Sequence, residues 1–498
     1  MSLSFSKIKV LHVASEMHPI VKKGGLGDVI GSLPKAQREL GVDSRVLLPL
    51  YPNVSNNIKE KLKKISRKLY IPLEWRVFPA SLWRTDIQGV PVYLLDIEDV
   101  PFPAEIYPNL LNMDLIKPFF LLSLAAIEFE KASRWRPQIL HLHDWPTSSV
   151  AIALKWHMYY SSLSGLYDTV LTIHNLAHQG IMQETDLISW GIPKEVHNIE
   201  GLEYYGMTNL LKGGIIASDA VTTVSPRYSW EIQTKEYGMG LDGVLKQYSN
   251  KLRGILNGID YSYWNPKTDP FIPAHYDVED IAPKRKCREE LLSRCGWSED
   301  GSPILIYVGR LAEQKGIDLI LLSIEPIVGH GCKMIILGEG SEIYERTLKK
   351  ASLQFPTNLF VKIGYDEELA HLMYAGGDML IMPSYFEPCG LAQLIAMRYG
   401  TVPICRATGG LADTVIDADT ACDGTGFLFS SYSSEAFLHA IGRALGAWNS
   451  TKLWNQIVQN CMRADFSWSR SSREYVNLYL ELLGVPEHED NVKPNFNA

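Results

Sequence analysis

Two cationic loops in this sequence carry residues that suit a phosphorylated ligand. The loop KKGG at 22–25 separates an apolar run from a helical pattern, and its adjacent glycines would let the backbone approach an anion at the helix start. The loop GRLAEQKG at 309–316 places Arg310 and Lys315 five positions apart, where they could bind the oxygens of a diphosphate. Taken alone, each loop could equally be an ordinary turn with solvated cations.

The stretch FEPCGLAQL at 386–394 adds an acid beside a further glycine turn. Glu387 follows an apolar run, and its carboxylate would accept hydrogen bonds from the hydroxyls of a sugar. Gly390 and Leu391 open a helical pattern, and the glycines of TGG at 408–410 precede another. Backbone N–H groups at such helix starts could bind a phosphate without further charge.

Four histidines occur in HLHDW (141–145) and HNLAHQG (174–180), at the ends of two apolar runs. A metal is the less favoured interpretation, because His141 and His143 recur at strand spacing and no carboxylate or thiolate cluster completes a ligand set. We expect His141 and His178 to satisfy loop backbone. The remaining residues suit a pocket for a polyhydroxy ligand: Asp144, His174, Asn175 and Gln179 as donors and acceptors, with Trp145 as a stacking face.

Short apolar runs alternate with helical patterns and must position these loops. Runs without polar alternation predict strands covered on both faces, and the helices between them indicate parallel βαβ crossovers. The sequence therefore predicts a doubly wound α/β architecture that occurs twice, with ligands at the carboxyl ends of the strands. The expected strands lie within 9–15, 44–50, 90–97, 138–145, 169–175 and 219–225, and then within 303–310, 333–340, 359–365, 378–384 and 401–407.

The 498 residues exceed one ordinary hydrophobic core, and a segment rich in Pro, Asp and Tyr at 254–284 interrupts the alternation. We predict a Rossmann-like N-terminal domain over 1–258 and a second Rossmann-like domain over 259–470. A terminal helix at 471–484 is expected to cross back to the N-terminal domain. The polar tail at 485–498 is expected to be flexible.

The composition excludes several classes of partner. A net charge of −8 and a pI near 5.9 argue against a general nucleic-acid or membrane-surface binder. The apolar run FFLLSLAAI at 119–127 is too short to span a membrane and predicts a core helix. The seven cysteines match no zinc pattern, and no leader pattern precedes the first strand, so we expect a cytoplasmic protein with reduced thiols.

Eight motifs in order closely resemble those of bacterial glycogen synthases and plant starch synthases. That resemblance implies retaining glucosyltransferases of the GT-B fold, with two Rossmann-like domains facing across a deep cleft. It also implies a bacterial cytosolic enzyme, or a plastid stromal one if the chain is a mature plant form. The motifs are KxGGLGDV (22–29), HDW (143–145), HNLAxQG (174–180), LNGID (256–260), RLxxQKG (310–316), GYDE (364–367), FEPCGLxQ (386–393) and RATGGLADTV (406–415).

The resemblance implies a role for matching positions in the first half of the chain. His174 matches the histidine at the transferred glucose, and Asp144 matches the aspartate that lines the acceptor side. Asn257 matches a residue near the sugar. The loop that contacts the nucleotide diphosphate and the donor is matched by Lys22, Gly24, Gly25 and Asp28.

Positions in the second half complete the implied site. Arg310 and Lys315 match the pair that holds the diphosphate, and Tyr365 matches the residue that stacks on the adenine. With His174 and Glu387 they form the implied catalytic set of His174, Arg310, Lys315 and Glu387. The loop around the glucose and phosphates is matched by Glu387, Cys389, Gly390, Leu391 and Ala392.

Three positions depart from the family pattern. Pro146 replaces a polar residue after HDW, and His178 replaces the common aromatic residue. Ala392 replaces the usual threonine, which removes a hydroxyl but leaves the backbone N–H. None of these changes touches the implied diphosphate pair, so we expect any effect to fall on the acceptor preference and not on the activity itself.

The implied reaction moves glucose from ADP-glucose to the non-reducing end of an α-1,4-glucan or malto-oligosaccharide, releasing ADP with retained configuration. We expect no metal and no cofactor. UDP-glucose stays open as the donor, because Tyr365 would stack on either base. A sucrose-synthase-like transferase would carry Glu at 395, where this chain has Ile395. A glucan-binding protein with a degenerate transferase fold is the non-enzymatic alternative, and LGEGSE at 337–342 does not fit a dehydrogenase fingerprint.

Overall fold

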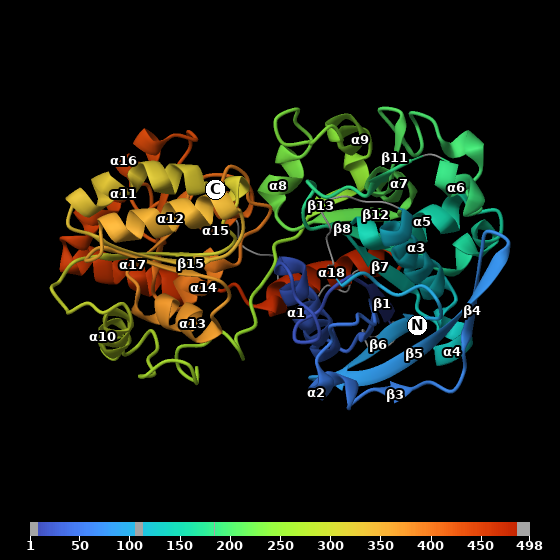
Figure 1. Cartoon of the computed structure of the whole chain (residues 1–498), viewed down its shortest axis with the longest axis horizontal. Helices are drawn as coiled ribbons and strands as arrows, with labels where there is room; N and C mark the ends of the chain where they lie inside the picture. The colour runs from blue at the N-terminus through green and yellow to red at the C-terminus, as the bar shows by residue number, and fades with distance from the viewer. Residues whose placement is uncertain (1–7, 105–112, 184, 486–498) are drawn as a thin grey trace. The chain divides into compact units, whose positions relative to one another are not determined.

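Parallel strands form the centre of both halves of the chain in the computed structural model (Figure 1), which describes residues 8–104, 113–183 and 185–485. The chain divides into two compact units. The first comprises Met1–Val224, Ser229–Ile255 and Trp468–Ala498, and the second comprises Ser225–Tyr228 and Leu256–Ser467. The tail at 486–498, predicted to be flexible, lies outside the described residues.

The first unit contains a ten-stranded described sheet in the order β13-β12-β8-β7-β1-β2-β6-β5-β3, with β4 paired to β5. From β13 to β6 all pairings are parallel, and the order β6-β2-β1-β7-β8-β12 is that of a Rossmann fold. The strands are β1 (Lys9–Val13), β2 (Asp43–Pro49), β3 (Lys63–Lys64), β4 (Leu69–Leu73), β5 (Arg76–Ile87), β6 (Val90–Ile97), β7 (Ile139–His143), β8 (Asp168–Ile173), β12 (Ala220–Thr223) and β13 (Leu252–Gly254).

Strands β3, β4 and β5 are antiparallel and were not predicted. Side chains alternate between buried and more exposed along β4, both residues of β3 are exposed, and β5 mixes the two without a long apolar run, while prolines interrupt β4 and β5. The search for uninterrupted apolar runs therefore passed over them. A further antiparallel sheet has the order β10-β11-β9 and contains β9 (Ile181–Met182), β10 (Glu203–Tyr204) and β11 (Met207–Asn209).

Helices cover both faces of the first sheet. Helices α1 (Gly25–Glu39) and α18 (Trp468–Leu482) pack together on one face, where Tyr475 and Tyr479 join a core with Val10 and Leu33 (Figure 1). The predicted core helix at 119–127 is confirmed as part of α3, with Phe119 to Ala126 buried. The α-helices described before residue 250, besides α1, are α2 (Asn56–Lys59), α3 (Met113–Ile127), α4 (Phe129–Ser133), α5 (Trp145–Trp156), α6 (Thr185–Ser189), α7 (Leu210–Ala217), α8 (Pro226–Glu231) and α9 (Asp242–Gln247).

The second unit contains a parallel sheet in the order β16-β15-β14-β17-β18-β19, again that of a Rossmann fold. The strands are β14 (Ile304–Val308), β15 (Lys333–Gly338), β16 (Leu359–Ile363), β17 (Met379–Met382), β18 (Val402–Arg406) and β19 (Phe427–Phe429). The helices are α10 (Lys284–Arg294), α11 (Ile317–Gly329), α12 (Glu342–Gln354), α13 (Glu367–Gly376), α14 (Ala392–Arg398), α15 (Gly409–Thr414), α16 (Ser434–Trp448) and α17 (Thr451–Arg463).

Each sheet has a point at which the chain order reverses, and ligands of such folds bind beyond the carboxyl ends of the strands there. In the first unit this point lies between β1 and β7, and in the second it lies between β14 and β17. The loops that leave these four strands carry most of the residues singled out from the sequence.

Candidate active site

The glycine loop after β1 is held by a buried acid that the sequence analysis did not select. Glu16 is fully buried, and its Oε2 accepts hydrogen bonds from the N–H groups of Lys23 at 2.5 Å and Gly24 at 3.0 Å. Lys22 Nζ lies 2.7 Å from Asp28 Oδ1. A side chain on Gly27 would stand 3.2 Å from Glu16 Oε2, so this glycine makes room for the carboxylate. The N–H groups of Lys23 and Gly24 therefore already bind an anionic group of the protein itself, the Glu16 carboxylate.

Asp144, directly after β7, fastens the neighbouring loop after β8. Its Oδ1 accepts a hydrogen bond from the His174 N–H at 2.7 Å, and its backbone has a φ of 58° and a ψ of −175°, a conformation found almost only at glycine. Burial raises the pKa of this carboxyl to about 7, with a smaller contribution from the negative Glu16. In this structure Asp144 thus holds the backbone that carries His174.

His174 is partly exposed and contacts a buried histidine. Its Nε2 lies 3.0 Å from His143 Nδ1, and burial lowers the pKa of His174 to about 3, so the ring is neutral at pH 7. His12, His141 and His143 are fully buried, and one ring nitrogen of each lies within 4.8 Å of those of the other two. Hydrogen bonds to neighbouring side chains account for these ring nitrogens without a metal ion.

Two expectations for this region are wrong. His141 does not serve loop backbone, because it bonds the Tyr479 hydroxyl and the Thr172 hydroxyl, both at 2.6 Å. Trp145 offers no stacking face, because it is 3% exposed and packs edge-on against Phe119. A Cβ on Gly180 would lie 2.7 Å from the Trp145 ring, so the indole packs directly against the backbone of the loop after β8.

Gln179 is also engaged within the first unit. Its side chain donates to the Leu176 and Met239 carbonyls, both at 3.1 Å, and accepts from Asn209 Nδ2 at 2.6 Å. His178 is exposed. Of the polar residues expected around a polyhydroxy ligand, Gln179 thus has its side-chain atoms committed to the protein.

The loop after β14 carries two cations that differ in their contacts with the described residues. Arg310 is exposed, and its guanidinium has no hydrogen-bond or ion-pair partner among residues 8–104, 113–183 and 185–485. Lys315 Nζ lies 2.5 Å from Glu387 Oε2, and the Ser384 hydroxyl donates to the same oxygen at 3.1 Å. Glu387 is 4% exposed, so the ion pair joins the loops after β14 and β17 in a largely dry environment.

Three glycines let the loops at this point approach one another closely. Gly316 has a φ of 70°, and a Cβ there would lie 2.1 Å from the Pro383 carbonyl oxygen. A Cβ on Gly409 would lie 1.9 Å from the Glu387 carbonyl oxygen, and one on Gly410 would lie 2.2 Å from the Cys389 carbonyl oxygen. The Gly410 N–H donates to the Glu387 carbonyl at 3.1 Å. The TGG segment thus supports the loop that carries Glu387.

The remaining predicted residues of the second unit differ in accessibility. Asn257 is 5% exposed, and its Oδ1 has no hydrogen-bond partner among the described residues. Cys389 is buried, and burial raises the pKa of its thiol to about 12, so it is a neutral packing residue. Tyr365 is 74% exposed. Leu391 caps α14 and Ala392 begins it.

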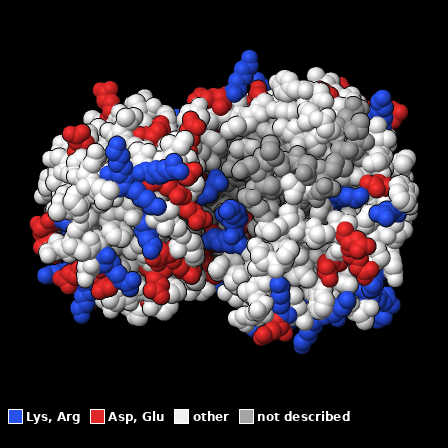
Figure 2. Space-filling view, in the orientation of Figure 1, with Lys and Arg blue, Asp and Glu red and all other residues white. Residues whose placement is uncertain are grey.

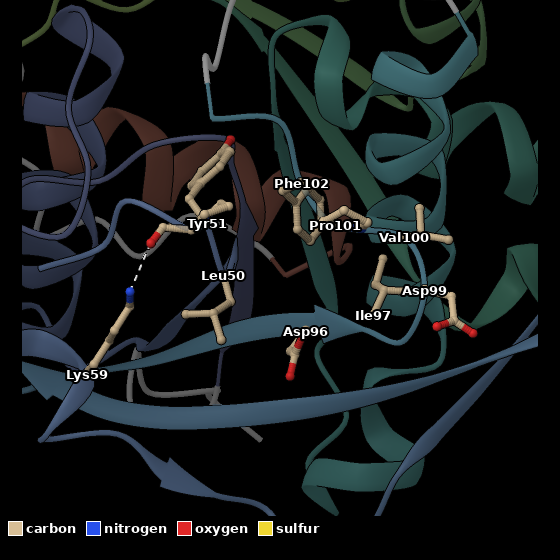
Figure 3. Close-up of a pocket in the computed structure, with 10 residues that line it drawn as sticks. Leu50, Tyr51, Lys59, Asp96, Ile97, Asp99, Val100, Pro101 and Phe102 are labelled. Atoms are coloured by element: carbon tan, nitrogen blue, oxygen red, sulfur yellow. Dashed lines mark hydrogen bonds between the residues drawn. The ribbon is translucent and has the colours of Figure 1, made fainter. Parts of the chain in front are cut away.

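A small pocket lies beyond the carboxyl ends of β2 and β6 in the first unit (Figure 3). It has a volume of about 340 Å³ and is lined by Leu50, Tyr51, Pro52, Lys59, Asp96, Ile97, Asp99, Val100, Pro101 and Phe102. Lys59 Nζ donates to the Pro52 carbonyl at 2.8 Å, and the Tyr51 hydroxyl donates to the Ser15 carbonyl at 2.8 Å. None of the residues predicted to bind substrate lines it, although the Tyr51 contact connects it to the loop after β1.

Charges of both signs are interspersed over the visible face of each unit (Figure 2). All seven cysteines are free thiols. Among the described helices, none is long and apolar enough to cross a membrane.

Comparison with known proteins accounts for almost the whole chain. Residues 9–247 match the starch synthase catalytic domain, and residues 295–460 match the glycosyl transferases group 1. A glycogen synthase from Thermodesulfovibrio yellowstonii is 39% identical over 498 residues, covering 97% of this chain and 99% of that protein. The chain belongs to the glycogen and starch synthase family. A glycogen synthase from Haemophilus influenzae is likewise 39% identical over 492 residues, covering 95% of this chain and 100% of that protein.

Solved structures agree with this family. The catalytic domain of starch synthase IV from Arabidopsis thaliana, bound to ADP and acarbose, matches with a TM-score of 0.89 and 33% identity, covering 96% of this chain and 99% of that one. A sucrose-phosphate synthase from Thermosynechococcus elongatus matches with a TM-score of 0.62 at 16% identity, which shows the fold alone. The predicted α/β fold of GT-B type, with two Rossmann-like domains, and the predicted class of glycosyltransferase are confirmed.

Proposed function

We propose that this chain transfers glucose from ADP-glucose to the 4-hydroxyl at the non-reducing end of an α-1,4-glucan, with retention of configuration. Membership of the glycogen and starch synthase family supports the reaction. The relative from Arabidopsis thaliana that is bound to ADP and acarbose supports a nucleoside diphosphate product and a glucan-like acceptor. The observation that carries the proposal is the exposed Arg310, which pairs with no residue in the described part of the chain and lies on the same loop as Lys315, the partner of Glu387.

The reaction breaks the bond between glucose C1 and the β-phosphate oxygen and forms a bond between C1 and the acceptor oxygen. Both events take place on one face of the sugar, and the acceptor proton passes to a phosphate oxygen of the leaving group. Negative charge therefore develops on the diphosphate, and fixed cations there lower the barrier. Arg310, which can bind two phosphate oxygens at once, is the principal candidate, with Lys315 beside it.

The remaining residues would bind and orient the substrates. Glu387 accepts hydroxyl protons of the glucose, while Lys315 neutralises its buried carboxylate. His174 contacts the same sugar, Asp144 keeps its loop in place, and Tyr365 stacks on the base. Cys389 contributes shape only, because its thiol stays protonated. We place the reaction in the bacterial cytosol, in line with the bacterial relatives.

The test compares ADP and UDP release from ADP-glucose and UDP-glucose in the presence of malto-oligosaccharide, with the new linkage read by proton NMR. The variant Arg310→Ala should lower kcat by about 100- to 1000-fold while the fold survives, as for the loss of one group that stabilises charge in the transition state. Arg285→Ala is the matched control, because Arg285 is exposed and its ion-pair partner within the described residues is Glu289 on its own helix. Near-normal transfer by Arg310→Ala, or glucan binding without nucleotide release by the wild type, would refute the proposal.

A further inference from the structure

A continuous hydrogen-bonded chain runs from His174 into the core of the first unit. His174 Nε2 lies 3.0 Å from His143 Nδ1, and His143 Nε2 lies 3.1 Å from His12 Nδ1. His12 Nε2 lies 2.8 Å from Gln37 Oε1. His12, His143 and Gln37 are 0% exposed, so each ring is limited to the partners that the protein supplies.

The contacts of Gln37 fix the orientation of its amide. The atom facing His12 also lies 2.6 Å from the Ser44 hydroxyl oxygen, a distance that suits O–H···O bonds and is shorter than the usual range for N–H···O. The other amide atom lies 2.9 Å from the Tyr479 hydroxyl oxygen, the usual length of an N–H···O bond. The carbonyl oxygen of Gln37 therefore faces His12 and Ser44, and its NH₂ group faces Tyr479.

This orientation determines which nitrogen carries the proton on each successive ring. A carbonyl oxygen only accepts, so His12 must donate from Nε2. Burial lowers the pKa of His12 to about 4, so the ring is neutral and its Nδ1 has no hydrogen. His143 must then donate from Nε2 to this bare nitrogen, and burial also lowers the pKa of His143, which leaves its Nδ1 bare in turn.

The same reasoning reaches His174, which must donate from Nε2 to His143 Nδ1. The neutral ring is then left with an unprotonated Nδ1. No described residue bonds that atom, and the residue is partly exposed. His174 therefore offers a ligand an acceptor and no ring proton at that nitrogen.

We propose that Gln37 is a positioning residue that, through His12 and His143, fixes His174 as a hydrogen-bond acceptor at Nδ1 for a hydroxyl of the transferred sugar. This inference rests on the proposed function for the identity of the ligand, but the proton positions exist in the protein without it. Gln37 lies three hydrogen bonds from His174 and touches no substrate.

Two substitutions at Gln37 separate this role from simple packing. Gln37→Glu keeps an oxygen that accepts from His12, and a protonated carboxyl can direct its O–H to Tyr479 in place of the amide NH₂. Gln37→Met is similar in size and better suited to an apolar core, but it provides no acceptor. Packing alone therefore predicts that the Met variant is the better enzyme, whereas the proton chain predicts the opposite order. Ser44→Ala is the matched control, because it removes a contact to the same oxygen without interrupting the chain.

The assay records nitrogen NMR spectra of the full chain labelled with ¹⁵N-histidine, with the His174 signals assigned by their loss in His174→Gln. Wild type, Gln37→Glu and Ser44→Ala should show a protonated Nε2 and a bare Nδ1 on His174. Gln37→Met should show both tautomers, with kcat lowered about tenfold, the equivalent of one lost hydrogen bond to the sugar.

A protonated Nδ1 on His174 in the wild type would overturn the inference, as would an unchanged His174 spectrum in Gln37→Met. A Met variant that is more active than the Glu variant would do the same. These results are independent of the proposed function, which fails instead if the wild type releases no nucleotide from its donor.

Discussion

Because Lys315 pairs with Glu387, replacing the lysine should affect both catalysis and stability. Lys315→Met removes a cation proposed to bind the diphosphate, and it also leaves a carboxylate that is 4% exposed without its counter-ion. A charge separation of 2.5 Å corresponds to a gross attraction of about 7 kcal/mol at an effective dielectric constant of about 20, most of which offsets the cost of desolvating both groups. Removing one partner exposes that cost, so we expect the second domain to lose about 3–5 kcal/mol of unfolding free energy.

Removing both charges separates stability from catalysis. The double variant Lys315→Met with Glu387→Gln leaves no buried charge unpaired, so its stability should return to within about 1 kcal/mol of wild type. If Lys315 binds the diphosphate, nucleotide release should stay at least about 100-fold below wild type in both variants. If Lys315 serves only to neutralise Glu387, the double variant should regain stability and transfer glucose as fast as Glu387→Gln alone.

Urea unfolding measures the free energies, and hydrogen exchange of the peptides containing β14 and β17 assigns the transition to the second domain. The nucleotide-release assay is run under the same conditions. A single variant as stable as wild type would show that the carboxylate is not confined as the structure has it. A double variant as unstable as the single one would show that the loss comes from packing and not from charge.

Two further predictions concern the domains separately. In the folded first domain His12 is neutral with a pKa of about 4, while in the unfolded chain it protonates near 6.5. The unfolding free energy therefore rises with pH between these values, and at pH 5 the protonation of His12 in the unfolded chain lowers it by about 2 kcal/mol. His12→Asn should give a shallower pH dependence of the urea midpoint than wild type, and an equal slope would contradict this. In the second domain, Gly409→Ala would bring a Cβ within 1.9 Å of the Glu387 carbonyl oxygen. This variant should lower the unfolding free energy by about 2 kcal/mol or more and abolish transfer, whereas Gly442→Ala, in a helix with open space around it, should not lower stability. A Gly409 variant as stable as that control in urea unfolding would contradict the close approach.

Much of the fold followed from patterns within short segments. Apolar runs without alternation predicted the strands from β1 to β12 that pair in parallel and all but the last strand of the second sheet, because strands buried on both faces have no polar side. The ribbon of β3, β4 and β5 was missed because its exposed side chains and its prolines break that pattern. Strands β13 and β19 have three residues each, too few to give any periodicity.

The candidate site divides in the same way. Glycine turns and cations after strands were visible locally, which is why Arg310, Lys315 and Glu387 could be selected, while their roles at a substrate stay predictions. The fully buried Glu16 directly follows a predicted strand but was not selected. An acid just ahead of a glycine loop is the signal that could have found it.

The sequence by itself determined the class of fold, the family and the loops that carry chemistry, because each depends on residue types at short spacing. Only the tertiary structure decided which groups meet. Lys315 pairs with Glu387 across 72 positions, and Gln37 bonds Tyr479 across 442, because parallel strand register and the packing of α18 on α1 bring them together. Hydrogen-bond polarity then passes from Gln37 to His174 only because every ring between them is buried and has a single partner on each side, a condition that no local pattern expresses.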